Sequence, residues 1–427
     1  MPALLPRSLA VAAVALIVAC STTPSTSAPS VSPEASAAAT TAAPAAVTPL
    51  KIGILIPFTE AALDADIGAS QRRAADLYLK LQGGALGGRP VQLVYNDESG
   101  LDPKTNDIRI QQFLQADHVQ MLMGGAGSVA AYQLRDAAEA AKVVYLDTNA
   151  SGNALTRATT GCSPSCKSRF VFRATSTSWQ LGEPLGEWAA KSGLKDVFAV
   201  YADDAFGTET AGAFGEGLAK GGGRLTGRAM WGARSGDWDR LISIIKAQPT
   251  KTVFAAFITD AAEGFIDAWT VAGMRAAGYR LLAPGQFADA AVLKATKQEG
   301  LGITTAYSWS TELDTAENRS FSDEFKKAYK EEDTGQPLAP DGYAVEMWDA
   351  MRVLDEALKV TKGDASADAL IAALEGVSAR TPVGPIAFDK TTHNPPLDVY
   401  IREVKLAGTT LVNAVIDKIA SVKDPGQ

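Results

Sequence analysis

Histidine, cysteine and excess positive charge are all scarce in this sequence of 427 residues. There are two histidines, His118 and His393, and three cysteines, Cys20, Cys162 and Cys166. So few candidate ligands argue against a histidine-rich catalytic metal site or a zinc framework. The formal net charge is -8, whereas a protein that binds duplex nucleic acid usually needs a basic excess. We therefore expect no metal, no cofactor and no nucleic-acid partner.

The first apolar run is short. Residues 1–19 carry one positive charge, Arg7, followed by about twelve mostly apolar residues, too few to cross a hydrocarbon core of about 30 Å comfortably. This layout is typical of a secretory signal peptide. The run ends in Leu16-Ile17-Val18-Ala19-Cys20, which resembles the bacterial lipobox. By that resemblance, Cys20 becomes the acylated first residue of a mature lipoprotein.

The next segment has almost nothing to bury. Residues 21–48 are Ala, Ser, Thr or Pro at every position except Val31, Glu34 and Val47. Such a composition predicts a disordered, extended linker over residues 20–49 that holds a folded body away from a membrane. The alternative is an ordinary leader without a spacing function, and both interpretations exclude the segment from the fold.

From residue 50 onward, short apolar runs alternate with helical patterns. We predict strands over 51–57, 91–95, 119–123 and 143–146, and helices over 69–82, from Asp102-Pro103 onward, and over 130–141. The alternation restarts after residue 170. There we predict strands over 197–201, 252–258, 280–283, 386–388 and 399–404, and helices over 208–220, 238–247, 261–272, 317–333 and 341–360. The pattern predicts an α/β fold with two Rossmann-like, doubly wound sheets in tandem.

Several phrases, in their order and spacing, resemble a known family over nearly all of residues 50–405. They include Lys51–Pro57, Gly88–Glu98 followed by Asp102-Pro103-Lys104, Gly124–Ser128, Tyr145–Ser151, Phe170–Thr175, Tyr201–Gly207, Ala272-Gly273-Met274 and Gly384–Asp389. The sequence resembles type-I periplasmic binding proteins. Within that fold, it looks most like the leucine/isoleucine/valine-binding family of ABC-transporter solute receptors.

The resemblance implies two discontinuous lobes joined by a three-stranded hinge. Lobe 1 would comprise residues 50–175 with 305–396, and lobe 2 residues 176–304 with 397–420. The ligand would lie between the lobes, outside the carboxyl ends of the strands, and hinge closure would signal occupancy to a membrane permease. The implied protein is a monomer at the extracytoplasmic face of a bacterial cell membrane, with an ABC permease and ATPase as partners.

Two loops are candidate binding sites for a ligand carboxylate. In Gly124–Ser128, glycines allow close approach of the backbone, and a following helix start would present free N–H groups near Gly127. By the resemblance, Ser128 binds the carboxylate; its alternative role is a helix N-cap. In the next loop the family supplies a backbone carbonyl at Asn149 and a hydroxyl at Ser151. The alternative there is a turn-forming polar cluster.

Other positions depart from the family pattern. The acid that pairs with a ligand ammonium falls on Gln286, and three family tyrosines fall near Ile67, on Ile258 and on Phe206. A glutamine brings no charge, and a buried ammonium without a counter-charge is costly. A small carboxylate, an amide or an aromatic acid therefore competes with an α-amino acid. Four loop aspartates that could restore the charge, or could simply be solvated, are Asp66, Asp203, Asp204 and Asp260.

Tryptophan could supply a stacking surface for such a ligand. Trp231, Trp238 and Trp309 could each stack on a ligand ring, although partly buried packing is the commoner role.

The sequence Cys162-Ser163-Pro164-Ser165-Cys166 places two cysteines in one short polar loop. Outside the cytoplasm, close cysteines usually pair, and this spacing can bring their Cα atoms within about 6 Å. We expect a structural disulfide; a redox pair or half of a zinc site are the alternatives.

Two other classes of function were weighed. An enzyme is not expected, because Gly-x-Ser-x-Gly is lacking and neither histidine falls in a predicted binding loop. Surface roles are expected for both His118 and His393. A ligand-sensing receptor with the same fold remains an alternative, although no transmembrane span is expected after residue 405.

Overall fold

The computed structural model describes residues 48–59, 62–99, 102–157, 167–232 and 236–426. By contacts between Cα atoms, Val47–Gln427 form one unit. Cys20, Cys162, Cys166, the leader and most of the linker lie outside the described residues. Their predicted roles therefore stay predictions.

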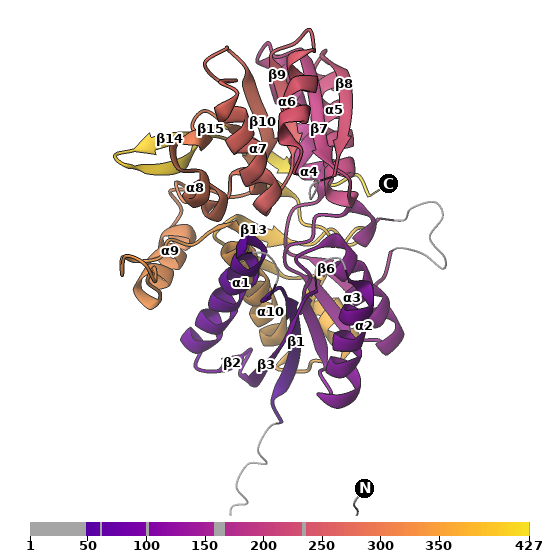
Figure 1. Ribbon diagram of the computed structural model, residues 1–427. Helices are drawn as coiled ribbons and strands as arrows, with labels where there is room; N and C mark the ends of the chain where they lie inside the picture. The colour runs from indigo at the N-terminus through magenta and orange to yellow at the C-terminus, as the bar shows by residue number, and fades with distance from the viewer. Residues whose placement is uncertain (1–47, 60–61, 100–101, 158–166, 233–235, 427) are drawn as a thin grey trace, which may run out of the picture. The chain divides into compact units, whose positions relative to one another are not determined.

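Six strands form the first sheet, in the order β2-β3-β1-β4-β5-β6 (Figure 1). Neighbouring strands are parallel except in the β2–β3 hairpin. Strands β1, β4 and β5 are buried almost throughout, as expected where helices cover both faces of a parallel sheet. The strands are β1 (Leu50–Ile56), β2 (Ala85–Leu86), β3 (Arg89–Asp97), β4 (Met121–Gly124), β5 (Val144–Asp147) and β6 (Val171–Arg173).

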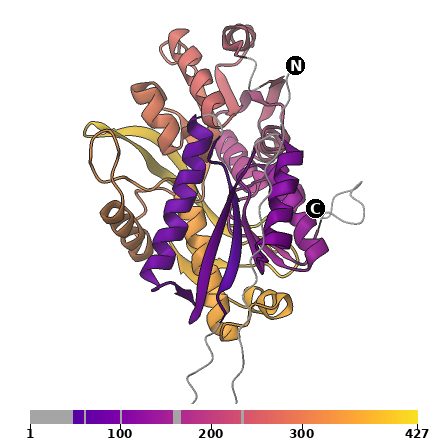
Figure 2. The same ribbon diagram turned by 60° about the horizontal axis from the view of Figure 1, so that its bottom comes forward.

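Helices from distant parts of the chain flank this sheet. Helices α1 and α10 pack against each other, as do α2 and α3, and Figure 2 shows α1 on one side of β1 and β3 with α2 and α3 on the other. The elements are α1 (Ala62–Leu81), α2 (Pro103–Gln111), the π-helix η1 (Gln112–Ala116), α3 (Ser128–Ala141), the 3-10 helix η2 (Asn153–Leu155), α9 (Ala316–Ala328), α10 (Gly342–Thr361) and α11 (Ala367–Leu374). A small hairpin, β12 (Ser378–Thr381) with β13 (Gly384–Ala387), follows α11.

Seven strands form the second sheet, in the order β15-β14-β11-β10-β9-β7-β8. Strands β7 to β11 are parallel, whereas β14 and β15 join antiparallel at one edge. The strands are β7 (Asp196–Ala202), β8 (Arg224–Trp231), β9 (Thr252–Ala256), β10 (Arg280–Pro284), β11 (Thr304–Tyr307), β14 (Leu397–Ala407) and β15 (Thr410–Val422).

The helices of the second sheet alternate with its strands. They are α4 (Ser178–Lys191), α5 (Ala205–Lys220), α6 (Trp238–Lys246), α7 (Thr259–Val271), α8 (Ala290–Thr296) and the 3-10 helices η3 (Gly285–Ala288) and η4 (Lys297–Gly300). The α4–α5 pair packs unusually closely. A Cβ added to Gly217 would lie 1.9 Å from the carbonyl oxygen of Glu183, so only glycine allows this approach.

Each sheet has a point where the strand order reverses. The chain passes from β1 to β3 on one side and then to β4 on the other; it likewise passes from β7 to β8 and then back to β9. Ligands of open α/β sheets bind outside the carboxyl ends of the strands at such points. The loops after β4 and β7 are thus the places where a ligand site is expected.

The predicted α/β fold with two doubly wound lobes is confirmed. Several elements were not predicted, and one predicted helix is too long. The unpredicted helices are α4, α8 and α11, and the unpredicted strands are β2, β6, β8, β11, β12 and β15. Helix α9 ends at Ala328 rather than 333, because Tyr329 is extended with φ -126° and ψ 148°.

The lobe boundaries stay a prediction. Strand β11, just after the expected crossing at 304–305, pairs within the second sheet.

Candidate functional site

All six predicted ligand residues lie just after the carboxyl ends of strands. Gly127 and Ser128 follow β4, Asn149 and Ser151 follow β5, Phe206 follows β7, and Gln286 follows β10. The first four belong to the first sheet and the last two to the second. Each of them therefore lies at a strand end, which is where doubly wound sheets bind ligands.

A buried carboxylate occupies part of the glycine-rich loop. Glu98, only 2% exposed, accepts hydrogen bonds from the backbone N–H groups of Ala126 (2.7 Å) and Gly127 (2.8 Å). Gly127 is the N-cap of α3, and Ser128 is its first helical residue. The alternative role of Ser128 as a side-chain N-cap is therefore wrong. Because Glu98 already uses two loop amides, a ligand anion would depend on the remaining groups, including the Ser128 hydroxyl.

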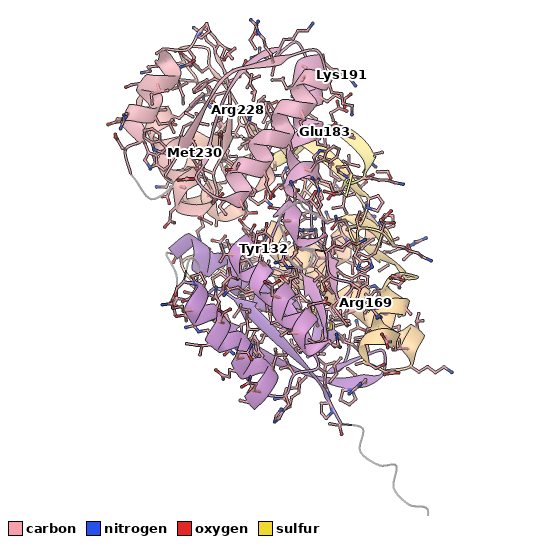
Figure 3. All side chains as sticks on the ribbon, turned by 90° about the vertical axis from the view of Figure 1, so that its right-hand side faces the viewer. Tyr132, Arg169, Glu183, Lys191, Arg228 and Met230 are labelled. Atoms are coloured by element: carbon pink, nitrogen blue, oxygen red, sulfur yellow. The ribbon has the colours of Figure 1, made fainter. Side chains whose placement is uncertain are left out.

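The structure brings the Ser128 and Ser151 loops together. A Cβ built on Gly152, the residue after Ser151, would lie 2.8 Å from Ser128 Oγ and 2.4 Å from the hydroxyl of Tyr132. Tyr132 lies on the first turns of α3 and is labelled in Figure 3. The sequence interpretation missed Tyr132, although its spacing of four residues from Ser128 on one helix face could have indicated it.

Asn149 is buried, and its side chain reaches a carboxyl group on α10. Its Nδ2 donates to Glu346 Oε2 at 2.8 Å. The Asn149 side chain therefore has a structural partner within the protein. The predicted ligand role, which uses the backbone carbonyl of Asn149 and the hydroxyl of Ser151, stays a prediction.

The loop after β5 is held by the buried ion pair between Asp147 and Arg173. Asp147 Oδ1 accepts from the backbone N–H groups of Asn149 (3.4 Å) and Ala150 (3.1 Å), and Asp147 Oδ2 lies 3.2 Å from Arg173 Nη1. Both charged side chains are fully buried. Burial raises the pKa of Asp147 to about 7, although Arg173 and the two amides favour the ionised form.

Gln286 is buried beside the second sheet and keeps an unused acceptor. It is 5% exposed, and its Oε1 has no hydrogen-bond partner among the described residues. Buried polar atoms are normally paired, so an unpaired amide oxygen at a strand end indicates a missing donor. The neighbouring carbonyl of Gly285 accepts from Arg402 Nη2 at 3.1 Å, which fixes the backbone at this position.

Phe206 and Ile258 add apolar surface at the ends of β7 and β9. Phe206 is 8% exposed at the start of α5, and Ile258 precedes the first residue of α7.

The four candidate aspartates, Asp66, Asp203, Asp204 and Asp260, do not supply an obvious partner for a ligand ammonium. All four are exposed, and Asp204 caps α5 by accepting from the Gly207 N–H at 2.7 Å.

All three tryptophans pack within the protein. Trp231 packs against the core of the second sheet, and the guanidinium carbon of Arg240 lies 5.7 Å from its ring centroid. Trp309 donates its Nε1 hydrogen to Asn318 Oδ1 at 2.7 Å, and Trp238 meets Phe257 and Phe265 edge-on. These contacts favour the packing interpretation over ligand stacking for Trp309 and Trp238.

The expectation of a surface role is correct for His118 but wrong for His393. His118 is exposed. His393 is 4% exposed, stacks on Phe172 with ring centroids 4.0 Å apart, and has hydrogen-bond partners in the Val171 carbonyl and Glu375. His393 lies in a proline-rich segment, which the sequence suggested was exposed, but this segment packs against β6.

Glu346 is the buried residue that sequence reasoning missed most completely. Its Oε1 accepts from the hydroxyls of Thr175 (2.6 Å) and Tyr307 (2.7 Å), and its Oε2 from Asn149. Burial raises the pKa of Glu346 to about 8, against the effect of these three donors. An acid within a helix gives no sequence signal for such a role, because most are solvated.

Hydrogen bonds join the ligand loop to two helices of the second sheet. From α4, the backbone N–H of Ser178 donates to the Ser151 carbonyl at 2.6 Å, and that of Trp179 donates to Asn153 Oδ1 at 3.1 Å. The backbone N–H of Asn153 in η2 donates to Glu209 Oε2 on α5 at 2.6 Å. Burial raises the pKa of Glu209. The segment after Ser151 thus contacts the helix that carries Phe206.

A cavity of about 920 Å³ lies beside this site rather than in it. Residues of α1, α8, β14 and β15 contribute to its lining, which includes Asp289, Trp309 and Arg402. None of the six predicted ligand residues lines it. We therefore do not assign the ligand to this cavity.

The described residues contain neither a candidate membrane span nor a candidate metal site. No helix there is both long and apolar enough to cross a membrane. In the same part of the chain, no group of three or more His, Cys, Asp or Glu side chains is arranged to hold a metal ion.

Comparisons with known proteins agree with this architecture. A family model described as "Periplasmic binding protein" matches residues 49–410. A curated relative from Brucella suis, named Leu/Ile/Val-binding protein homolog 6, is 27% identical over 380 residues, covering 88% of this chain and 93% of the relative.

Two solved structures from Rhodopseudomonas palustris are also similar. One is a solute-binding protein of an ABC transporter in complex with 3,4-dihydroxybenzoic acid, with a TM-score of 0.79 and 27% identity, covering 88% of this chain and 99% of that one. The other is an ABC-transporter solute-binding protein in complex with benzoate, with a TM-score of 0.76 and the same identity and coverage.

Proposed function

The chain belongs to the periplasmic binding protein family, and from this premise we propose that it is the lipid-anchored solute-binding protein of an ABC importer. Its ligand is a small organic acid that carries an uncharged hydrogen-bond donor, with hydroxylated aromatic carboxylates as the leading class. Closure of the two lobes around this acid presents the occupied protein to the permease.

The carboxylate of the ligand binds at the first sheet. The Ser128 hydroxyl and the loop of Ser151 meet there, next to the start of α3. A helix start favours negative charge, and hydroxyl donors add hydrogen bonds to an ionised acceptor. Glu98 holds two amides of the same loop and so keeps the loop shaped for this contact.

The opposite end of the ligand faces Gln286. The unpaired Oε1 calls for a donor but offers no charge, which suits a phenolic hydroxyl better than an ammonium group. The proposed ligand class depends mainly on this unpaired Gln286 Oε1. Phe206 and Ile258 supply apolar wall that an aromatic ring would contact.

The relatives support two ligand classes. The two solved relatives bind 3,4-dihydroxybenzoic acid and benzoate. The curated relative is named as a homolog of a Leu/Ile/Val-binding protein, that is, of a protein that binds branched-chain amino acids. The neutral Gln286 favours the first class, because an α-amino acid would bring an ammonium to a buried position without a facing acid.

The remaining parts of the proposal concern the ends and surroundings of the chain. Cys20 carries the lipid, residues 20–49 form the tether, and the protein works as a monomer at the extracytoplasmic face of the cell membrane. Cys162 and Cys166 form a local disulfide. Thiol titration under denaturing, non-reducing conditions tests that bond, and two reactive thiols would contradict it.

Small molecules released from freshly purified protein test the proposed ligand class. The protein is denatured after purification without dialysis, and the supernatant is analysed by mass spectrometry. We expect an organic acid without an amino group. A branched-chain amino acid in stoichiometric amount would contradict the assignment of Gln286.

A further inference from the structure

We propose that Arg173 is a positioning residue for ligand binding: its guanidinium sets the shape of the loop Asp147–Gly152 that presents Ser151. This inference rests on the proposed function, because it assumes that the Ser151 loop contacts the ligand. Arg173 itself does not touch the ligand in this account.

The contacts of Arg173 surround Ser151 on both sides. Nη1 donates to the carbonyl of Ala150, the residue before Ser151, and Nη2 donates to the carbonyl of Gly152, the residue after it, at 2.7 Å. Nη1 also meets Asp147 Oδ2 at 3.2 Å. One fully buried side chain therefore fixes the beginning of this loop and both neighbours of the predicted ligand serine.

Arg173 also ties this loop to a distant segment of the chain. Its Nε donates to Asn394 Oδ1 at 3.2 Å, and its backbone N–H donates to the carbonyl of His393 at 3.1 Å. Residues 393–394 follow the β12–β13 hairpin and precede β14, so they lead from elements near the first sheet into the second. The ligand loop is thereby connected to a segment that passes between the two sheets.

The chemistry requires an arginine. Four acceptors, one carboxylate, two carbonyls and one amide oxygen, lie around a planar group with donors on three nitrogens. A lysine ammonium is a compact charge on a flexible stem and cannot satisfy acceptors placed around a fork. Without the fork, the carbonyls of Ala150 and Gly152 would lose buried donors, and the loop would relax toward other conformations.

The test compares Arg173→Lys with a matched control, Arg157→Lys. Arg157 is also buried, and it forms a two-point ion pair with Asp424 at 2.9 and 2.7 Å.

Affinity for 3,4-dihydroxybenzoate is measured by calorimetry on the full chain, and hydrogen exchange of the Asn149 and Ala150 amides is measured without ligand. We expect at least tenfold weaker binding and at least tenfold faster loop exchange for Arg173→Lys. The control should lose stability but keep its affinity and loop exchange.

Several outcomes would overturn the proposal. Normal affinity with normal loop exchange in Arg173→Lys would do so, as would an affinity loss of equal size in Arg157→Lys. If Arg173→Lys does not fold, Asn394→Ala removes the Nε acceptor, with Thr156→Val as its control because Thr156 also bonds Asn394. Faster loop exchange in Asn394→Ala alone supports the proposal, and unchanged exchange contradicts it. If the wild-type protein does not bind the acid, the proposed function fails, and the exchange measurement still decides the role of Arg173.

Discussion

Asn149 and Glu346 lie 197 residues apart in the chain, yet Asn149 Nδ2 donates to Glu346 Oε2 at 2.8 Å. Glu346 also accepts from Thr175, just after β6, and from Tyr307, the last residue of β11. A single carboxyl group on α10 therefore joins the predicted ligand loop to strands of both sheets. The protonation state of Glu346 consequently affects how firmly these parts are held together.

Replacing Glu346 by Gln should flatten the dependence of stability on pH. Burial raises the pKa of Glu346 to about 8, so the folded protein holds this proton more tightly than the unfolded chain does. Its contribution is complete below about pH 4.3 and is lost as the pH rises through about 8. Between pH 5 and pH 8.5, the wild-type protein should therefore lose on the order of 2–4 kcal/mol more unfolding free energy than Glu346→Gln.

Denaturant unfolding at a series of pH values measures this difference. Asp289, whose pKa is also raised to about 7 by burial, remains in both proteins. Asp147, with a pKa likewise raised to about 7, also remains, but it interacts electrostatically with Glu346, so the difference between the profiles includes this coupling. Identical pH profiles for the two proteins would contradict the prediction.

Each of the two serines should contribute to anion binding. Ser128→Ala and Ser151→Ala each remove a donor to a ligand carboxylate, and a hydrogen bond to a charged group is worth about 1.5–3 kcal/mol. The dissociation constant for 3,4-dihydroxybenzoate should rise about ten- to hundredfold, as measured by calorimetry. Ser322→Ala, at a buried serine on α9, is the control and should leave affinity unchanged. Wild-type affinity in both Ser128→Ala and Ser151→Ala would show that these two loops do not bind the ligand carboxylate.

Gln286→Leu should erase discrimination between hydroxylated and plain benzoates. The leucine keeps the approximate size of the side chain but removes the acceptor Oε1. Affinity for 4-hydroxybenzoate should fall about tenfold, which corresponds to one neutral hydrogen bond, while affinity for benzoate changes little. Competition binding with the two ligands measures the ratio. An equal loss for both would mean that the hydroxyl does not face Gln286.

Cys20→Ser should release the protein from the membrane. Without the thiol no acyl chains can be attached, and the tether has too little apolar surface to hold the protein to a bilayer. The wild-type protein should sediment with membranes, and the variant should be found in the soluble extracytoplasmic fraction. Sedimentation of the variant with membranes would show that another feature anchors the chain.

Sequence reasoning predicted the residues that lie directly after strands. Gly127, Ser128, Ser151 and Gln286 could be placed because a short apolar run followed by small polar residues indicates a strand end, and parallel strand ends meet at one edge of a sheet. The resemblance then gave each position a role. Local pattern and chain order thus account for the position of these residues, and their ligand roles stay predictions.

The supporting charges could not be predicted in the same way. Glu98, Arg173 and Glu346 act on partners that are distant in the chain, and a charged residue is usually solvated, so the sequence gives it no default partner. Glu98 is the exception, since it directly follows β3, the strand beside β1, and chain order could have indicated that it comes near the β4 loop. Helix α4 was missed for another reason: its two glycines and Pro184 lower its helix propensity, whereas packing against α5 determines its structure.

A paired calorimetric titration tests the central claim most directly, namely that the ligand is an acid without an ammonium group. Ligand-free wild-type protein is titrated with 4-hydroxybenzoate and with leucine in the same buffer at pH 7. The account predicts saturable one-to-one binding of 4-hydroxybenzoate at least a hundredfold tighter than that of leucine. Tighter binding of leucine would contradict it.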